Sequence, residues 1–342
     1  MNVSWADREK VDLLRLMVRM RRFDYVAMYS YCRPGEMGGW LLCSVGQETV
    51  AACARSLLGP MDHTITGFRG MGHAIAAGIG MKSCMAELMG FAEGCSKGKA
   101  GACGFYAPHL RHWGCHPSAG SQTPLAAGLA FGLVHRGEAG AVVCFLGDGA
   151  VNAGAYHEAL NLAGLFNLPV VYLIENNGYA MGTSVARSSA YRDCLAKRAE
   201  GYGIEWDRFS DADPYEMRAR ISIALDRARF QRRPTVLEIE TYRYYGFSIA
   251  DAHHKRYRMP EEIEARKARD PLNLWQARLI AEGLLDESAA EAIHEEAKSE
   301  ALASVAAAKQ GRPPAVSDIT SDVYWESDHA TVAGTTGRHF FE

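Results

Sequence analysis

The chain has 342 residues, of which 48% are hydrophobic and 23% are charged, which is the composition of an ordinary globular protein. Its formal net charge of −3 argues against a nucleic-acid-binding surface, and no apolar stretch approaches the ~20 residues that a membrane span needs. The N-terminus lacks the apolar core of a signal peptide, and the nine cysteines stand at scattered spacings. We therefore expect a cytoplasmic protein with reduced thiols and with no membrane or nucleic-acid partner.

The first expected element is a long amphipathic helix that begins near Ser4 and ends at Pro34 and Gly35. The stretch QETVAACARSLLGP predicts a second helix, and HTITGF predicts a short strand. Residues 67–121 are glycine-rich, and apart from one helix over MKSCMAELMGF they read as loops that carry aromatic residues and histidines. Because long loops in compact domains are usually functional or disordered, we interpret this region as functional.

From residue 124 onward the pattern becomes regular. The segments AVVCFLGDG, VVYLIENNG and PTVLEIETYRYYG contain nearly continuous apolar runs, and helical segments stand around them: PLAAGLAFGLVHRG, GAYHEALNLAGLFNLP and YEMRARISIALDRARFQ. Apolar strands that alternate with helices predict an α/β fold with a parallel sheet covered by helices on both faces. We expect residues from about 260 to 310 to be helical and residues 311–342 to form an extended tail, within one domain over 1–342.

Two polar motifs follow neighbouring strands of this predicted sheet. GDG, with Asp148, comes after one strand, and ENNG, with Asn177, comes after the next. The carboxyl ends of parallel strands meet at one edge of the sheet, near helix N-termini, so we expect these two side chains to lie together. A carboxylate, an amide oxygen and a backbone carbonyl are hard ligands that suit Mg²⁺ shared with a diphosphate. Either motif alone is usually a turn or a loop, but the pair in this strand context favours a site.

The segment GDGAVNAGAYHEALNLAGLFNLPVVYLIENNGYAMGTS closely resembles the thiamine-diphosphate motif, in which NN follows GDG after about thirty residues. It is most similar to the α subunit of E1 enzymes, such as pyruvate, branched-chain 2-oxo acid and acetoin dehydrogenases. Further segments fall in the family's order and extend the resemblance over nearly the whole chain: RMRRFD, SVGQETVAACA, DHTITGFRGMGH, GCSKGKAG, QTPLAAGLAFG, PTVLEIETYRYYG, RDPL and SDVYWE. The resemblance implies the thiamine-diphosphate-binding fold.

For the metal, the resemblance implies that Asp148, Asn177 and the backbone carbonyl of Tyr179 hold Mg²⁺. It also implies that Gly149 and Ala150 belong to the cofactor-binding turn, where glycine lets the backbone approach the phosphate near a helix N-terminus.

For the rest of the cofactor, the resemblance implies that Phe68 and Arg69 meet the diphosphate, since a planar guanidinium suits bidentate phosphate contacts. Phe68 stands where the family usually has tyrosine, so one hydroxyl contact is lost. The segment from Pro117 to Ala119 is expected to lie against the aminopyrimidine.

The resemblance implies that this chain forms half of an active site. In the family, the glutamate that activates the aminopyrimidine comes from a separate β subunit, and nothing in this sequence resembles that β-type domain. The implied partner is an E1β-like subunit in an α2β2 heterotetramer, and a lipoyl acyltransferase component is the further partner that dehydrogenase chemistry requires.

Four positions depart from the family's pattern by loss of a histidine, and the residues found there are Leu42, Met71, Gly104 and Phe247. His73 follows closely after Met71, but at the start of a helix it would point to the other side. A positioned histidine contributes ~10²–10⁴-fold to a proton transfer. Acyl transfer to a lipoyl disulfide needs such a proton, so it is the step that these departures affect most.

Three functions remain open at this point. The first is E1-like decarboxylation of a 2-oxo acid with transfer of the acyl fragment. The second is a carboligase, which uses an aldehyde or a second carbonyl compound as acceptor, or a non-oxidative decarboxylase, which uses no acceptor. Both work without lipoyl groups. The third is a non-catalytic paralogue that binds the cofactor or a partner; the intact Asp148, Asn177 and Arg69 argue against it.

The segment FYAPHLRHWGCHPSAG offers further candidates for catalysis, His109, His112 and His116, and Tyr245 is another. An acid–base or substrate-recognition loop and an insertion with surface histidines are alternative interpretations of this segment. Nearby cysteines raise zinc as a third, but the spacing fits no compact set of zinc ligands.

Overall fold

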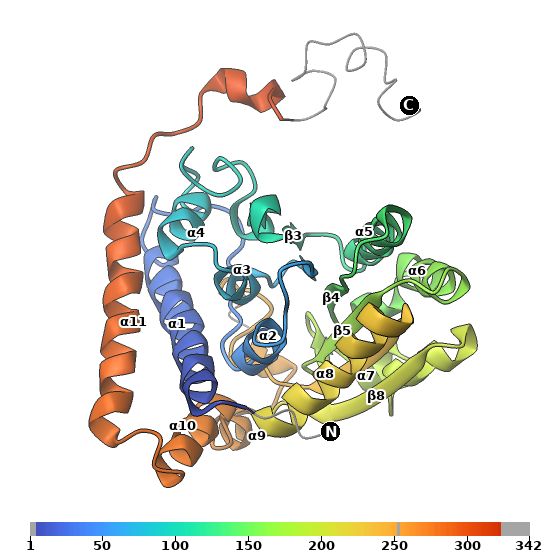
Figure 1. The fold of residues 1–342 in the computed structure, drawn as a ribbon. Coiled ribbons are helices and arrows are strands. Elements are labelled where there is room, and N and C mark those ends of the chain that lie inside the picture. Colours follow the sequence, from blue (N-terminus) through green and yellow to red (C-terminus); the bar gives the residue numbers. More distant parts are fainter. Residues whose placement is uncertain (1–4, 252–253, 323–342) are drawn as a thin grey trace.

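The computed structural model describes residues 5–251 and 254–322, and its centre is a seven-stranded sheet with strand order β2-β3-β1-β4-β5-β9-β8 (Figure 1). The strands are β1 (His63–Gly67), β2 (Tyr106–Ala107), β3 (His112–His116), β4 (Val142–Gly147), β5 (Val170–Asn176), β8 (Glu205–Ser210) and β9 (Thr235–Glu240). Every neighbouring pair is parallel except β2 with β3. A separate two-stranded pair consists of β6 (Tyr179–Ala180) and β7 (Thr183–Ser184). The predicted parallel sheet is confirmed.

Helices cover both faces of this sheet, as predicted. Alternate side chains of β4 enter different cores: Val143 and Phe145 join one cluster, and Val142, Cys144 and Leu146 join the other. Because successive side chains of a strand point to opposite faces, a strand that is buried on both faces must be apolar throughout. This explains why the strand could be recognised from its unbroken apolar run.

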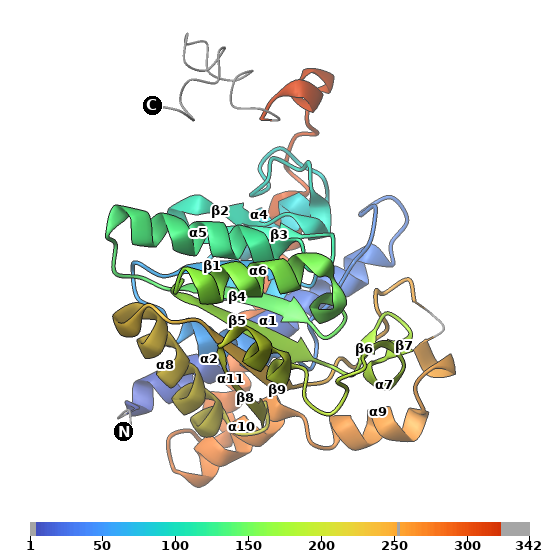
Figure 2. The same cartoon turned by 90° about the vertical axis from the view of Figure 1, so that its right-hand side faces the viewer.

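The helices divide between these two cores. On one face lie α1 (Asp7–Tyr31), α2 (Glu48–Arg55), α3 (Met71–Ala77), α4 (Met81–Leu88), α8 (Pro214–Gln231), α10 (Pro271–Ala281) and α11 (Glu287–Ala308). On the other lie α5 (Gln122–Arg136) and α6 (Gly154–Leu165), which run side by side in Figure 2. The short α7 (Val185–Ser188) and α9 (Pro260–Lys267) flank the β6–β7 pair. No described helix is long and apolar enough to cross a membrane, and all nine cysteines are free thiols.

Three expectations concern the ends of the chain: the first needs correction, the second is confirmed in more detail, and the third falls largely outside the described residues. The first helix begins at Asp7, with Ala6 as its N-cap, while the expected cap Ser4 lies outside the described residues. The helical region near 260–310 consists of three helices, because Asp270 and Asp286 each cap a new helix by accepting hydrogen bonds from its first backbone N–H groups. Residues 311–322 contain one 3₁₀ turn, and the predicted tail beyond them lies outside the described residues.

The glycine-rich region 67–121 is more regular than predicted, since it contains α3, β2 and β3 besides the expected helix α4. Its irregular part is organised by Glu87, a fully buried residue of α4. The carboxylate of Glu87 accepts hydrogen bonds from four backbone N–H groups, those of Ser96, Gly98, Ala100 and Gly101, at 2.7–3.0 Å. One buried acidic side chain therefore takes the place of secondary structure in holding this loop.

Candidate functional site

A cavity of about 380 Å³ lies at the carboxyl ends of β1, β4 and β5. The nine residues expected at the cofactor all line it: Phe68, Arg69, Pro117, Ala119, Asp148, Gly149, Ala150, Asn177 and Tyr179. The parallel pairing of β4 with β5 sets Gly147 opposite Glu175, so the GDG and ENN motifs leave the sheet next to each other. The structure therefore brings Asp148 and Asn177 into one cavity.

Asp148 carries an unsatisfied buried oxygen in this cavity. Its side chain is almost fully buried, and its Oδ1 accepts a hydrogen bond from the backbone N–H of Gly149 at 2.7 Å. Its Oδ2 has no partner among the described residues. Burial raises the pKa of Asp148 to about 6, against the opposing effect of the Gly149 and Gly178 N–H groups and of Arg243. A buried carboxylate oxygen without a partner is costly, and a bound cation would satisfy it.

Asn177 and Tyr179 are held by a local turn. The Oδ1 of Asn177 accepts a hydrogen bond from the backbone N–H of Tyr179 at 3.2 Å, and its Nδ2 donates to Gln47 Oε1 at 3.3 Å. Gly178, between them, has a φ of +85°, which glycine adopts without strain. The phenol of Tyr179 donates to Glu262 at 3.0 Å. The ring is thus tied to α9, and the turn holds the amide oxygen of Asn177 at the cavity.

The positive charge of the cavity comes from Arg69. Its guanidinium donates to two backbone oxygens, those of Cys43 and Phe247, and meets no carboxylate in the described part of the chain. Burial and the neighbouring Arg243 lower the pKa of Arg69 to about 10. A partly buried guanidinium without an acidic partner is stabilised by a bound anion. With a cation at Asp148, the donor set fits a metal-bound diphosphate.

The turn after β4 also requires close backbone approach. A Cβ atom placed on Gly149 would lie 2.5 Å from the Cβ of Ala180, closer than any real contact. The turn leads into α6, whose N-terminus begins at Gly154, so its free N–H groups face the same end of the sheet.

Several lining residues have no counterpart in the sequence-based expectations: Trp40, Thr66, Gln47, Cys103, Gln122, Glu175 and Met181. Gln47, Gln122 and Met181 lie in segments that carry the family resemblance, which assigns them no role. Trp40 comes from a loop outside those segments, and only the tertiary fold brings it to the cavity.

Three aromatic residues, Trp40, Phe68 and Phe247, form what we call the aromatic collar of this cavity. The ring centroids of Phe68 and Phe247 are 5.3 Å apart, and those of Trp40 and Phe247 are 6.1 Å apart, both in edge-to-face geometry. Trp40 remains 63% exposed. The collar continues with Met181 into a second, more open hollow of about 330 Å³. The approach to the site is therefore largely apolar.

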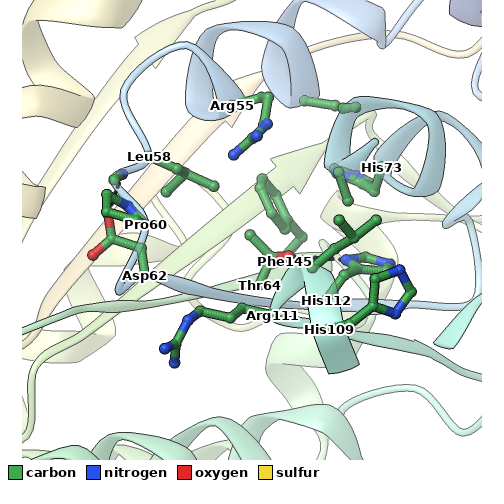
Figure 3. A pocket seen from close by; sticks show the side chains of 15 residues that line it. Arg55, Leu58, Pro60, Asp62, Thr64, His73, His109, Arg111, His112 and Phe145 are labelled. Carbon is green, nitrogen blue, oxygen red and sulfur yellow. Dashed lines mark hydrogen bonds between the residues drawn. The ribbon is translucent and has the colours of Figure 1, made fainter. Parts of the chain in front are cut away.

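The structure does not bring the proposed catalytic candidates into this cavity. His109 and His112 line a different cavity of about 220 Å³ (Figure 3). His116 lies 3.3 Å from the carbonyl oxygen of Trp113, and the half-buried Tyr245 packs on the hydrophobic core. The interpretation as surface histidines fails for His112, which is fully buried. Among the residues described, no histidine lines the cofactor cavity.

Three of the four positions noted for a replaced histidine are buried away from the cavity: Leu42, Met71 and Gly104. The fourth, Phe247, lines it. His73 does not line the cofactor cavity, and its Nε2 lies 3.2 Å from both carboxylate oxygens of Glu175. His73 lines the cavity of about 220 Å³, and Glu175 lines the cofactor cavity. This pair therefore forms part of the wall between these two cavities.

Comparison with known proteins points to one family. The model described as "Dehydrogenase E1 component" matches residues 15–317. The chain is 37% identical over 316 residues to the pyruvate dehydrogenase E1 component subunit alpha of Rickettsia felis, which covers 92% of this chain and 96% of that protein. It is 39% identical over 282 residues to the protein of the same name from Zymomonas mobilis, covering 82% and 78%. The testis-specific mitochondrial form of Rattus norvegicus is 32% identical over 327 residues, covering 95% and 82%.

Proposed function

Because the chain belongs to the dehydrogenase E1 component family, as the α subunit of a thiamine-diphosphate-dependent 2-oxo acid dehydrogenase, we propose that the cavity at the ends of β4 and β5 holds thiamine diphosphate through Mg²⁺. The observation that carries this proposal is the buried, unpartnered Oδ2 of Asp148 in the same cavity as Asn177. The proposed metal ligands are Asp148, Asn177 and the backbone carbonyl of Tyr179.

Each neighbouring residue then has a physical task. Arg69 offsets the charge of the diphosphate, and Gly149 lets the backbone lie against it. When bound, thiamine diphosphate supplies the electron sink that lets a 2-oxo acid lose carbon dioxide. The aromatic collar gives the approach to that reaction an apolar wall. No described side chain of the collar is able to donate a proton, so proton transfers depend on other groups.

A β-type subunit completes the enzyme, and the structure offers a surface for it. Five exposed apolar side chains share the outer face of α5 and α6, and we call them the α5–α6 patch: Leu125, Phe131, Leu162, Leu165 and Phe166. The ring centroids of Phe131 and Phe166 lie 5.8 Å apart, so apolar side chains of the two helices meet in this patch. Contiguous exposed apolar surface marks an interaction site. We propose that an E1β-like subunit packs here in an α2β2 assembly and brings the activating glutamate.

A second candidate function rests on the collar itself. Phe247 has no proton to offer, and no histidine lines the described cavity. This favours a carboligase or a non-oxidative decarboxylase, in which no lipoyl disulfide has to be protonated. The relatives are named pyruvate dehydrogenase components, which favours lipoyl transfer with a lipoyl acyltransferase as the further partner.

Isothermal titration calorimetry tests the cofactor proposal on the complex of this chain with its β-type subunit. We expect thiamine diphosphate to bind in the presence of Mg²⁺, and Asp148→Ala to abolish that binding. Asp12→Ala, which changes an exposed aspartate of α1, is the matched control and should bind like the parent. Binding that survives Asp148→Ala, or a parent complex that never binds, contradicts the proposal.

Product analysis separates the two candidate functions. The complex is supplied with a panel of 2-oxo acids and aldehydes, with and without a lipoyl domain. Acylation of the lipoyl domain identifies the dehydrogenase reaction. A hydroxyketone or a free aldehyde without lipoyl acylation identifies the second function instead.

A further inference from the structure

The cavity in Figure 3 has no role in the proposed reaction. It lies on the α2 and α3 side of the sheet, under the 3₁₀ turn Pro108–Leu110, and encloses about 220 Å³. It shares no lining residue with the cofactor cavity. A ligand here would therefore not compete with the cofactor for space.

A buried and unsatisfied histidine lines this cavity. His112 is fully buried, and burial lowers the pKa of its imidazole to about 3, so the ring is neutral. Its Nδ1 lies 2.9 Å from the hydroxyl of Thr64, while its Nε2 has no hydrogen-bond partner among the described residues. In the tautomer in which the Thr64 hydroxyl donates to Nδ1, the single ring proton is on Nε2. In that tautomer the cavity wall contains a hydrogen-bond donor that needs an acceptor.

The opposite side of the cavity is cationic. Arg55, in the last turn of α2, has no side-chain partner in the described part of the chain, and Figure 3 shows its guanidinium turned toward the space beside Leu58 and Phe145. The acidic residue nearby, Asp62, does not cancel this charge, because Arg229 already pairs with it. A free guanidinium and a neutral N–H donor together favour an anionic oxygen group.

The remaining wall decides which kind of anion fits. Apolar groups line about half of the cavity, among them Phe145, Leu58, Ala76 and Ala77. Inorganic phosphate would leave these surfaces in contact with water, whereas a short hydrocarbon body would cover them. The volume is below the ~300 Å³ lower bound of ordinary ligand pockets, which limits the ligand to a few carbon atoms.

We propose that this cavity is a binding site for a small organic carboxylate. The carboxylate lies between the guanidinium of Arg55 and the Nε2 of His112, and the hydrocarbon body lies against Phe145. The site is adjacent to the cofactor cavity through the His73–Glu175 contact, but its occupancy requires neither cofactor nor turnover.

Saturation-transfer NMR titrations with propanoate test this site on the α/β complex saturated with Mg²⁺ and thiamine diphosphate. We expect the parent to bind propanoate and Arg55→Met to weaken binding about tenfold or more, because a charge-assisted hydrogen bond is lost. Arg8→Met, at an exposed arginine of α1, is the matched control and should leave the affinity unchanged. His112→Phe, which removes Nε2 and keeps an aromatic ring, should weaken binding in the same direction.

Three results would overturn the proposal: no saturation transfer to propanoate in the parent, equal affinity in the parent and Arg55→Met, or tighter competition by inorganic phosphate than by propanoate. The turnover of Arg55→Met at trace substrate should equal that of the parent. A complex that lacks turnover altogether but still binds propanoate through Arg55 would count against the proposed function and leave this site in place.

Discussion

Phe247 packs edge-on against Phe68, and its backbone oxygen accepts a hydrogen bond from Arg69 at 3.0 Å. The residue that closes the collar therefore also positions the guanidinium proposed to meet the diphosphate. Consequently, a substitution at Phe247 that preserves the backbone should change the chemistry at the collar while leaving Arg69 in place.

Phe247→His is expected to add a proton donor to the collar. If the missing proton limits acyl transfer, acylation of a lipoyl domain should rise, by up to ~10²-fold for a well-placed imidazole. The measurement is the rate of lipoyl-domain acylation by the α/β complex. Phe247→Leu removes the ring without adding a donor, and an equal gain in both variants would show that the proton is not limiting.

Gly149→Ala should reduce cofactor affinity by steric means alone. The new Cβ would lie 2.5 Å from the Cβ of Ala180, so either the GDG turn or β6 must move. We expect thiamine diphosphate to bind at least tenfold more weakly, as measured by calorimetry. Gly201→Ala, where a Cβ meets nothing within 4 Å, should bind the cofactor like the parent. Unchanged affinity in Gly149→Ala would show that the turn adapts freely.

Phe131→Glu should weaken assembly with the β-type subunit. Phe131 is a 49% exposed residue of the α5–α6 patch that contacts Phe166, and burying a charge there without a partner costs several kcal/mol. Sedimentation velocity should show the heterotetramer dissociating at concentrations where the parent stays assembled. Phe230→Glu, at an exposed phenylalanine of α8, provides the matched control. Equal dissociation of both variants would argue against this patch as the contact.

The stability of the α chain should fall as the pH rises from about 4 to about 7 because of Asp24. Burial, followed by the charge of Glu48, raises the pKa of Asp24 to about 7 in the fold, although Ser44 donates two hydrogen bonds to it. The unfolded chain ionises near ~3.9, so over this range the folded state holds the extra proton and stability drops as pH rises, by at most ~1.4 kcal/mol per unit.

Asp24→Asn removes this titration. Urea unfolding midpoints of the variant and the parent, measured at pH 5.5, 6.5 and 7.5, should differ progressively in favour of the variant as pH rises. Parallel curves would mean that Asp24 stays ionised throughout.

The interior of the sheet could be predicted because its physical constraints are local. Strands β4 and β5 are buried on both faces and therefore read as apolar runs, and α6 between them follows a helical pattern. Strand β3 was not predicted, because a five-residue segment with Gly114 and two histidines carries no strand pattern and is stabilised by pairing with β1. Strand β8 escaped prediction because it lies at the sheet edge, where half of its side chains are exposed.

The residues of the cofactor cavity also differ in whether the sequence alone could predict them. Asp148 and Asn177 were predictable, since two motifs on neighbouring parallel strands must converge. Trp40 was not, because its contact with Phe247 joins two loops that are distant in the sequence. The Asp148 oxygen without a partner also required the structure, since only burial shows what a side chain lacks.

Glu87 has a consequence for how activity data on this enzyme should be interpreted. A buried acid beside an irregular loop would be a natural target in a search for catalytic carboxylates, and Glu87→Gln would be expected to lose activity. Its four backbone hydrogen bonds show why such a loss would be misleading: the amide offers one acceptor oxygen where the carboxylate offers two. Inactivation at this position would report a disordered loop, and a protease-sensitivity assay would distinguish it from a lost chemical step.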